Sequence, residues 1–306
     1  MKIELSPATG VLGAENAAMT SAARPKRRLT RLWRSVLLRA VPLALYVAIA
    51  LLGPPLSTYN PVAVQIAQRL KPPGTILQDG SRAWFGTDQV GRDLLAQVIR
   101  GARVSLVISL ATVGVAGLVG SLLGLLAGYF GRAADMIIMR LADIQLAFPS
   151  ILLAILIAAV LGPSITNVII TLAFTRWVVF ARLARATTLT IKEREFVTAA
   201  RASGAGTARI LMRHIGPSLV APFLVIATVE MGLVIIAEAS LSFLGLGTSA
   251  AEPSWGFVIA NGRDYLNNAW WISTIPGIAL SLVVLSVGVF GDRLRDALDP
   301  RLSRRA

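Results

Sequence analysis

The sequence predicts an all-α membrane protein with six transmembrane helices, and three observations lead to this fold class. Of the 306 residues, 55% are hydrophobic and only 15% are charged, with a mean hydropathy of +0.69. Soluble domains carry about 25% charged residues. Apolar runs of about 20 residues, long enough to cross a bilayer, recur along the chain. Basic residues gather between alternate runs, as expected of loops that stay on the cytosolic side.

The amino-terminal region predicts a tail followed by a first span. Residues 1–34 are polar, rich in alanine and basic toward their end, so we expect a disordered cytosolic tail. The apolar run 41–52 lies within a first span predicted over residues 35–56. A basic region before an apolar run also describes a signal peptide. However, Gly53-Pro54-Pro55 follows the run in place of a small-residue cleavage site, which favours an uncleaved span.

Residues 57–103 are predicted to form an external loop, although this segment carries six basic residues. Long loops follow the positive-inside rule less strictly than short ones. Toward the end of the loop, four apolar side chains recur at helical spacing: Val90, Leu94, Val98 and Ala102. We therefore expect an amphipathic helix on the membrane surface before the second span.

Residues 104–290 are predicted to form a core of five further spans. The second span, 104–130, carries Gly120, Gly124 and Gly128, a spacing that lets a neighbouring helix approach closely and favours packing within the bundle. The third span, 136–161, contains Pro149, which should kink the helix or mark its start. The remaining spans are predicted at residues 165–181, 219–239 and 271–290. Residues 291–306 should form a cytosolic tail.

A charged insert between the fourth and fifth spans, residues 184–217, has the pattern of a cytosolic helical hairpin. A short helix with a face of small, mildly apolar side chains ends at Gly204, residues 207–215 can form a second helix, and Pro217 suits the first turn of the fifth span. Such a face can dock in a groove on a partner, but it equally suits a helix that rests on lipid headgroups. The residues assigned to the docking hairpin are Glu195, Phe196, Ala199, Ala200, Arg201, Ser203, Gly204 and Pro217.

Two glutamates fall within the predicted fifth span. Glu230 lies at mid-span, where a charged side chain costs at least about 2–3 kcal/mol on insertion scales, so it should face the bundle interior or a water-filled path. Glu230 can line a translocation path, with Arg176 as a second candidate, or it can form an internal ion pair with Arg176. Glu238 is expected near the outer interface. Arg140 and Asp143, three residues apart, are expected to neutralise each other.

The composition also limits the kinds of chemical site that this chain can form. It contains no cysteine and a single histidine, His214, which argues against disulfides and against a zinc-type metal site. No lysine lies in a Gly-x4-Gly-Lys-[Ser/Thr] motif, so no ATP-binding loop is predicted. We expect no catalytic residue, no bound metal and no bound cofactor. The net charge of +14 resides in loops and tails, where it indicates topology and not a nucleic-acid partner.

Several motifs resemble those of ABC importer permeases of the binding-protein-dependent peptide/nickel subgroup. The insert resembles their Glu-Ala-Ala-x3-Gly-x9-Ile-x-Leu-Pro pattern at Ala199-Ala200, Gly204 and Pro217, while Thr198, His214 and Gly216 depart from it. The segment 85–93, Phe-Gly-Thr-Asp-Gln-Val-Gly-Arg-Asp, is similar to a second signature of the subgroup. Further similar segments are residues 101–106, 139–149, 238–247 and 291–300. The second permease of dipeptide, oligopeptide or glutathione importers bears the strongest resemblance.

The resemblance implies a bacterial inner-membrane protein with both termini in the cytosol. It implies three kinds of partner besides membrane lipid: a homologous second permease, two ATP-binding subunits, and an extracytoplasmic solute-binding protein. ATP and Mg would be bound by the ATP-binding subunits, which the hairpin 184–217 would contact. An external scoop, residues 247–269, would meet the binding protein through Trp255 and Gly256.

The cargo implied by the resemblance is a small peptide or a peptide-like solute. Nickel chelates, glutathione and opines remain open as cargo. The alternative function is a proton-coupled secondary transporter that uses Glu230, which would take up solute without ATP. Six spans and the lack of a visible inverted repeat argue against this alternative.

Overall fold

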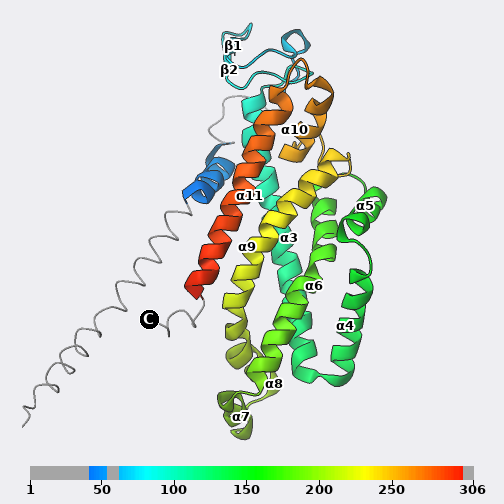
Figure 1. Ribbon diagram of the computed structural model, residues 1–306, viewed down its shortest axis with the longest axis vertical. Helices are drawn as coiled ribbons and strands as arrows, with labels where there is room; N and C mark the ends of the chain where they lie inside the picture. The colour runs from blue at the N-terminus through cyan, green and yellow to red at the C-terminus, as the bar shows by residue number, and fades with distance from the viewer. Residues whose placement is uncertain (1–40, 54–61, 299–306) are drawn as a thin grey trace, which may run out of the picture.

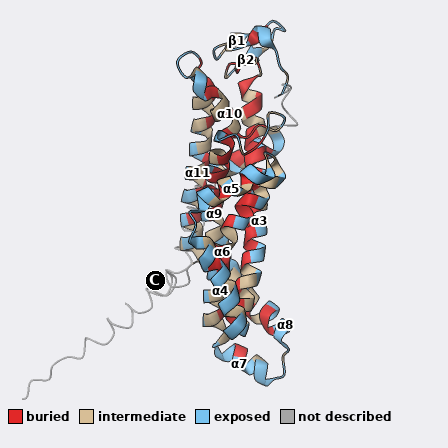
Figure 2. Ribbon diagram, turned by 90° about the vertical axis from the view of Figure 1, so that its right-hand side faces the viewer, coloured by how far each residue is buried: buried red, intermediate tan, exposed pale blue. Residues whose placement is uncertain are grey.

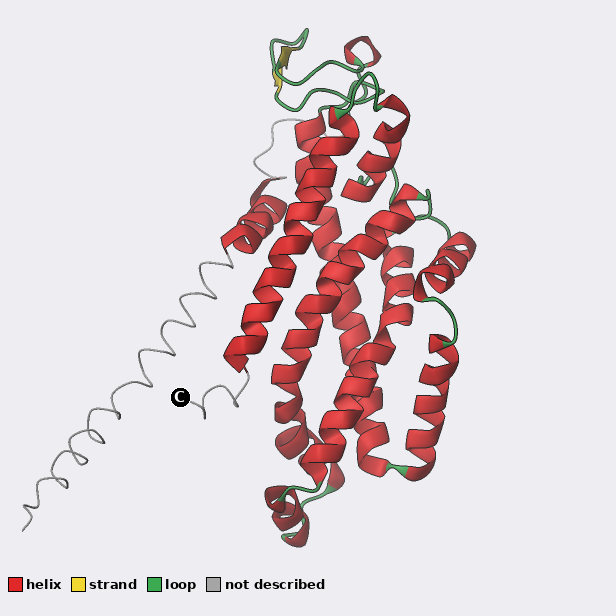
Figure 3. Cartoon of the chain, in the orientation of Figure 1, coloured by secondary structure: helices red, strands yellow, loops and turns green. Residues whose placement is uncertain are grey.

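The computed structural model describes residues 41–53 and 62–298, which are almost entirely helical (Figures 1 and 3). An apolar helix at Val41–Gly53 comes first. The later α-helices are α3 (Leu94–Phe130), α4 (Arg132–Leu146), α5 (Ser150–Leu161), α6 (Ile165–Lys192), α7 (Glu195–Ala202), α8 (Thr207–Arg209), α9 (Gly216–Phe243), α10 (Trp255–Gly262) and α11 (Trp271–Leu298). The minor elements are the strands β1 (Thr75–Ile76) and β2 (Arg82–Ala83), the 3-10 helices η1 (Ile66–Gln68) and η3 (Arg263–Tyr265), and the π-helix η2 (Ile210–Ile215).

Four helical segments are long and apolar enough to cross a bilayer: α3, α6, Thr207–Phe243 and α11. The predicted third span is broken, because α4 and α5 meet at an angle of 88°. Pro149 stands at the N-cap of α5, where its missing N–H and its restriction of the preceding residue favour such a break. Of the predicted first span, residues 35–56, the structure describes Val41–Gly53, which is helical and apolar; the rest of that prediction lies outside the described residues. Within the described residues, the other five predicted spans become four full helices and one bent pair.

The surface helix expected before the second span is not a separate element. Helix α3 runs without a break for 37 residues, so Leu94, Val98 and Ala102 belong to the same helix as the predicted second span. Val90 lies in the preceding loop, and the Asp93 side chain caps the helix by accepting from the Ala96 N–H at 2.8 Å. A helix of this length spans about 55 Å, against about 30 Å for the hydrocarbon core, so α3 projects beyond the bilayer.

Close contact between α3 and α6 forms the centre of the bundle. The core combines Ile108 of α3, Leu172 and Phe180 of α6, and Val234 and Leu241 of α9. Figure 2 shows the buried residues running along the middle of the bundle. At Gly120, Gly124 and Gly128, an added Cβ would collide with residues of α6, which confirms that these small residues serve packing within the bundle.

The two ends of the bundle carry different structures (Figure 1). One end has α7 and α8, and the other has the β1–β2 hairpin, the loop before α3, and α10. The loop before α3 is held by Asp88, which accepts from the backbone N–H groups of Val90 and Arg92 and from the Gln97 side chain at 2.8–3.0 Å. The Trp271 indole N–H donates to the Thr87 carbonyl at 3.2 Å. The segment 85–93 therefore has a structural role in this loop.

Candidate functional site

The hairpin predicted between the fourth and fifth spans begins with α7 and a sharp turn. Gly204 has φ +81°, a conformation that favours glycine. The Gly204 N–H donates to the Arg201 carbonyl, and the Ala205 N–H donates to the Ala200 carbonyl, both at 3.0 Å. This pair of bonds is the Schellman motif, which satisfies carbonyl groups at the end of a helix. The predicted helix break at Gly204 is confirmed.

The second limb of the hairpin differs from the expected separate helix. It consists of the short α8 and the π-helix η2, and together with α9 it forms one continuous helical segment, Thr207–Phe243. Pro217 occupies the first turn of α9, as predicted from its missing N–H. Single turns of π-helix are rare and occur often at functional sites. The second limb of the hairpin is therefore joined to the fifth span by a continuous helical backbone.

One side of the hairpin is packed against the bundle. Val197 of α7 is fully buried with Ile210, Leu211 and Ile215, and this cluster packs against partly buried residues. Those residues are Leu125 and Tyr129 of α3, Ile191 of α6, and Ala205. Val197 was missed in the sequence, where its only signal was an apolar β-branched side chain among polar neighbours. The cluster ties α7 to the ends of α3 and α6.

The opposite side of α7 is open. Glu195, Ala199, Arg201, Ser203 and Gly204 are exposed, and Ala200 is partly exposed. Phe196 is half-exposed and its ring stacks on His214, with 6.5 Å between ring centroids and 22° between ring planes. The structure thus brings the predicted docking residues to one end of the molecule, except Pro217, which lies in α9.

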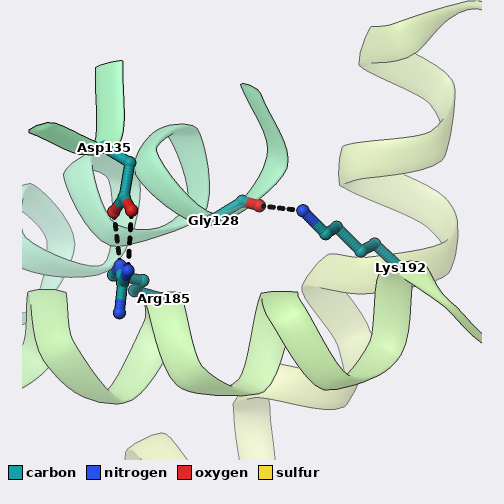
Figure 4. Close-up of polar contacts among 4 residues, drawn as sticks. All are labelled: Gly128, Asp135, Arg185 and Lys192. Atoms are coloured by element: carbon teal, nitrogen blue, oxygen red, sulfur yellow. Dashed lines mark hydrogen bonds and ion pairs between the residues drawn. The ribbon is translucent and has the colours of Figure 1, made fainter. Parts of the chain in front are cut away.

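The same end of α6 holds the turn between α3 and α4 (Figure 4). The Lys192 ammonium donates to the Gly128 carbonyl at 3.0 Å, at the end of α3. The Arg185 guanidinium binds both carboxylate oxygens of Asp135 in α4. Bidentate pairs of this kind restrict geometry more than single contacts do. Helix α6 therefore connects α7 with both α3 and α4.

The expected ion pair between Arg140 and Asp143 is replaced by a contact between helices. Asp143 of α4 accepts from the Arg182 guanidinium of α6 at 2.7 Å. Further along α4, the Gln145 side chain donates to the Thr175 carbonyl and accepts from the Trp177 indole. Spacing along one helix predicted a local pair, but the position of α6 beside α4 offered Asp143 a different partner.

Glu230 and Arg176 lie inside the bundle and form an ion pair. The Arg176 Nη1 to Glu230 Oε2 distance is 3.5 Å, and the two residues connect α6 with α9. Glu230 is only 5% exposed, in keeping with the expectation that it faces the interior. Of the two sequence interpretations, the internal ion pair is present in the structure.

Glu238, expected near the outer interface, is covered by other parts of the chain. It is fully buried, and its carboxylate accepts from the Ser242 hydroxyl at 2.7 Å and from the Ser105 hydroxyl at 3.4 Å. Helix α10 and the loop before it cover this end of α9, and Ser254 at the N-cap of α10 donates to Ser242. Position along the span alone gave no sign of this cover.

Trp255 and Gly256, assigned to contact a binding protein, are both buried. The Trp255 indole N–H donates to the Val98 carbonyl at 2.8 Å, and its ring lies 5.5 Å from that of Tyr46. Gly256 sits so close to the backbone of Ala239 that a side chain would collide with it. Both residues pack α10 onto neighbouring helices, so neither presents a surface to a partner in this structure.

Within residues 41–53 and 62–298, no group of three or more histidine, aspartate or glutamate side chains could hold a metal ion. The features that stand out are an anchored helical hairpin at one end and a bundle with an ion pair inside it. These features define a multi-pass helical membrane protein with an exposed hairpin at one end.

The comparison with known proteins identifies the family. Residues 120–304 match the family described as binding-protein-dependent transport system inner membrane component, and the chain belongs to this family. The chain is 44% identical over 263 residues to the di/tripeptide transport system permease protein DppC of Pseudomonas aeruginosa, covering 86% of each chain. It is 39% identical to the probable D,D-dipeptide transport system permease protein DdpC of Escherichia coli, again over 86% of each chain.

Another relative is the glutathione transport system permease protein GsiD of Pectobacterium atrosepticum, with 42% identity over 72% of this chain and 74% of the relative. Among solved structures, an inward-facing MetNI methionine ABC transporter has a similar fold. The TM-score is 0.54 with 17% sequence identity, over 67% of this chain and 98% of that chain.

Proposed function

We propose that this chain is the transmembrane permease subunit of an ATP-driven importer and forms half of the translocation path for small peptides or peptide-like solutes. Relatives named as permeases for di/tripeptides, D,D-dipeptides and glutathione support this cargo. The observation that carries the coupling role is the α7 hairpin, whose one side is buried on α3 and α6 while its other side is exposed.

The proposed assembly contains a homologous second permease, two ATP-binding subunits and an extracytoplasmic solute-binding protein. The family description, which names binding-protein dependence and the inner membrane, supports the last partner and the location. We place both termini in the cytosol. ATP and Mg bind to the ATP-binding subunits, and this chain contributes neither a catalytic residue nor a cofactor site.

In the proposed cycle, ATP binding moves the ATP-binding subunits, and Glu195, Phe196, Ala199, Ala200 and Arg201 transmit that movement. The Val197 cluster and the Lys192 contact with Gly128 pass it to α3 and α6. The Arg176–Glu230 pair lines the translocation path and joins α6 to α9. A shift of α6 against α9 therefore changes the distance between the two charged groups. The bundle thus acts as a two-state element that a partner's ligand biases.

The alternative, a proton-coupled transporter that uses Glu230, is less well supported. Glu230 forms an internal ion pair with Arg176, and the relatives are named as transport system permeases. The alternative predicts uptake by this chain alone, abolished when the proton gradient collapses and indifferent to ATP.

The Gly204→Val variant tests the coupling role. A β-branched residue at φ +81° strains the backbone by about 1–2 kcal/mol, while an added Cβ meets no atom within 4 Å. We expect the turn after α7 to change its conformation, so that ATP hydrolysis is uncoupled from solute uptake. Membrane insertion should be retained. The measurement is dipeptide uptake and ATP hydrolysis by the complete transporter in proteoliposomes.

Gly206→Val is the matched control, because Gly206 lies in the same turn with φ −66° and also has open space around it. This control should keep uptake and hydrolysis coupled. Normal uptake by Gly204→Val would count against the hairpin's role. As a direct check of contact, Ala200→Cys should crosslink to an ATP-binding subunit that carries cysteines around its groove.

A further inference from the structure

A polar cavity lies at the end of the molecule opposite the hairpin. Two other cavities, of about 550 and 630 Å³, are walled almost entirely by aliphatic and aromatic side chains. The polar cavity has a volume of about 650 Å³, within the range typical of ligand sites. The lining residues that distinguish it are Gln89, Phe243, Asn261, Arg263, Asp264 and Tyr265.

The walls of this cavity come from separate parts of the chain. Gln89 belongs to the loop before α3, Pro163 to the turn between α5 and α6, and Phe243 to the end of α9. Asn261 lies in α10, and Arg263 and Asp264 lie in η3. Movement of these elements relative to one another would therefore change the shape of the cavity.

Opposite charges stand side by side at the wall. The Arg263 Nε to Asp264 Oδ1 distance is 3.4 Å, and the two side chains are 57% and 76% exposed. An ion pair this exposed contributes about 0–1 kcal/mol, so both groups can change partner at little cost. The Arg263 guanidinium also lies over the Phe243 ring, 5.6 Å from its centroid. A lone anion would be repelled by Asp264 and a lone cation by Arg263.

The Gln89 side chain belongs to the wall of the same cavity. The Gln89 side-chain oxygen is buried and has no hydrogen-bond partner among the described residues. A buried acceptor without a partner costs about 1–3 kcal/mol, which a rotation of the Gln89 side chain toward a ligand N–H would offset. The cavity therefore offers one cationic group and one anionic group, with the Gln89 side chain beside them.

The floor of the cavity is tied to the bundle. Ser242 and Thr248 line it and belong to a chain of hydroxyl groups that ends at Glu238. Thr248 donates to Ser254 at 3.0 Å, Ser254 to Ser242 at 3.2 Å, and Ser242 to Glu238 at 2.7 Å. These bonds hold the floor on α9, as a preorganised site requires.

We propose that this cavity binds a small zwitterionic, peptide-like solute before it enters the translocation path. Arg263 binds the carboxylate and Asp264 binds the ammonium. On binding, the Gln89 side chain rotates so that its oxygen accepts from an N–H of the solute. This assignment rests on the proposed function, because it takes the solute to arrive from the extracytoplasmic side.

The absence of cysteine from the chain permits a direct binding test. In the complete transporter, with partner subunits also freed of cysteine, Asn261→Cys places a single thiol at the cavity wall. The measurement is the rate of alkylation by N-ethylmaleimide with and without millimolar L-alanyl-L-alanine. We expect the dipeptide to slow alkylation, and its N-acetylated, C-amidated form, which carries no charge, to have no effect.

Charge removal should weaken this protection. Added to Asn261→Cys, Arg263→Gln or Asp264→Asn should raise the dipeptide concentration for half protection about tenfold, because one charge-assisted hydrogen bond is lost. Arg69→Gln and Asp79→Asn remove the same charges at exposed positions outside the cavity and should leave protection unchanged. Ser249→Cys, on another wall of the cavity, serves as a second reporter if Asn261→Cys fails to assemble.

Equal alkylation with and without dipeptide at both reporters, or equal protection by the uncharged analogue, would overturn the proposal. The test requires neither ATP nor a coupled hairpin, so protection should persist in Gly204→Val. Loss of coupling in Gly204→Val without any protection would reject the cavity site alone. Protection together with unchanged uptake in Gly204→Val would reject the hairpin's role and leave the cavity site standing.

Discussion

The glycines of α3 show how single residues decide the approach of two helices. At Gly124, a Cβ would overlap the Ala181 carbonyl oxygen of α6, and at Gly120 it would overlap the Trp177 carbonyl oxygen. Backbones can come this close only where a side chain is missing. Gly114 lies in the same helix with no atom within 4 Å of its added Cβ, so its role is different.

We therefore predict that Gly124→Val destabilises the bundle while Gly114→Val does not. Forcing atoms into a closely packed interface costs about 1–3 kcal/mol, which should lower the melting temperature and the recovery of the assembled transporter. The measurement is thermal unfolding of the purified complex in detergent or nanodiscs. Identical melting of both variants would show that the α3–α6 contact tolerates a larger separation.

At the scale of the element, α6 links the hairpin with three other helices. It contacts the end of α3 through Lys192 and α4 through Arg185 and Arg182. It contacts α9 through Arg176, whose partner Glu230 is nearly fully buried. A buried pair that loses one partner leaves a charge uncompensated, so the energy of the contact depends strongly on both groups.

A double-mutant cycle measures the coupling between α6 and α9. Arg176→Gln or Glu230→Gln alone should destabilise the protein by about 3–5 kcal/mol, because one charge remains buried without its partner. The combined Arg176→Gln/Glu230→Gln variant should recover most of that loss, as judged by thermal unfolding. Strictly additive losses would show that the two groups do not interact. If the pair also lines the translocation path, the stable double variant should transport more slowly.

The whole molecule has two chemically different ends, with the α7 hairpin at one and the β1–β2 hairpin with the polar cavity at the other (Figure 1). The helices between them present many apolar side chains to their surroundings, among them Leu118, Leu156 and Leu285. Such exposed apolar surface suits lipid and subunit contacts. We therefore expect the two ends to lie on opposite sides of the membrane.

Labelling of single cysteines checks this orientation. Gln78→Cys and Ser203→Cys place exposed thiols at the two ends. In intact spheroplasts, a membrane-impermeant maleimide should label Gln78→Cys, because residues 57–103 are predicted to be external. Ser203→Cys should react only after the membrane is made permeable. Labelling of both thiols in intact spheroplasts would contradict the orientation.

The sequence predicted features that depend on neighbours along the chain. The apolar runs of α3, α6, α9 and α11 are recognisable because each helix must cover its own backbone and present apolar side chains to lipid. Gly204 and Pro217 were recognisable because φ and the missing N–H are properties of single residues. The glycine spacing in α3 predicted close packing, but not that α6 would be the partner.

Tertiary structure alone decided which residues meet across the bundle. The partner of Asp143, the burial of Val197 and the cover over Glu238 depend on helices far away in sequence. The same holds for Trp255, which seemed apt for a surface contact and lies against Val98 and Tyr46 instead. Local chemistry determined where this chain forms helices and turns. Long-range packing determined which polar groups are paired inside the bundle and which remain exposed at the surface. These pairings depend on the positions of all helices at once.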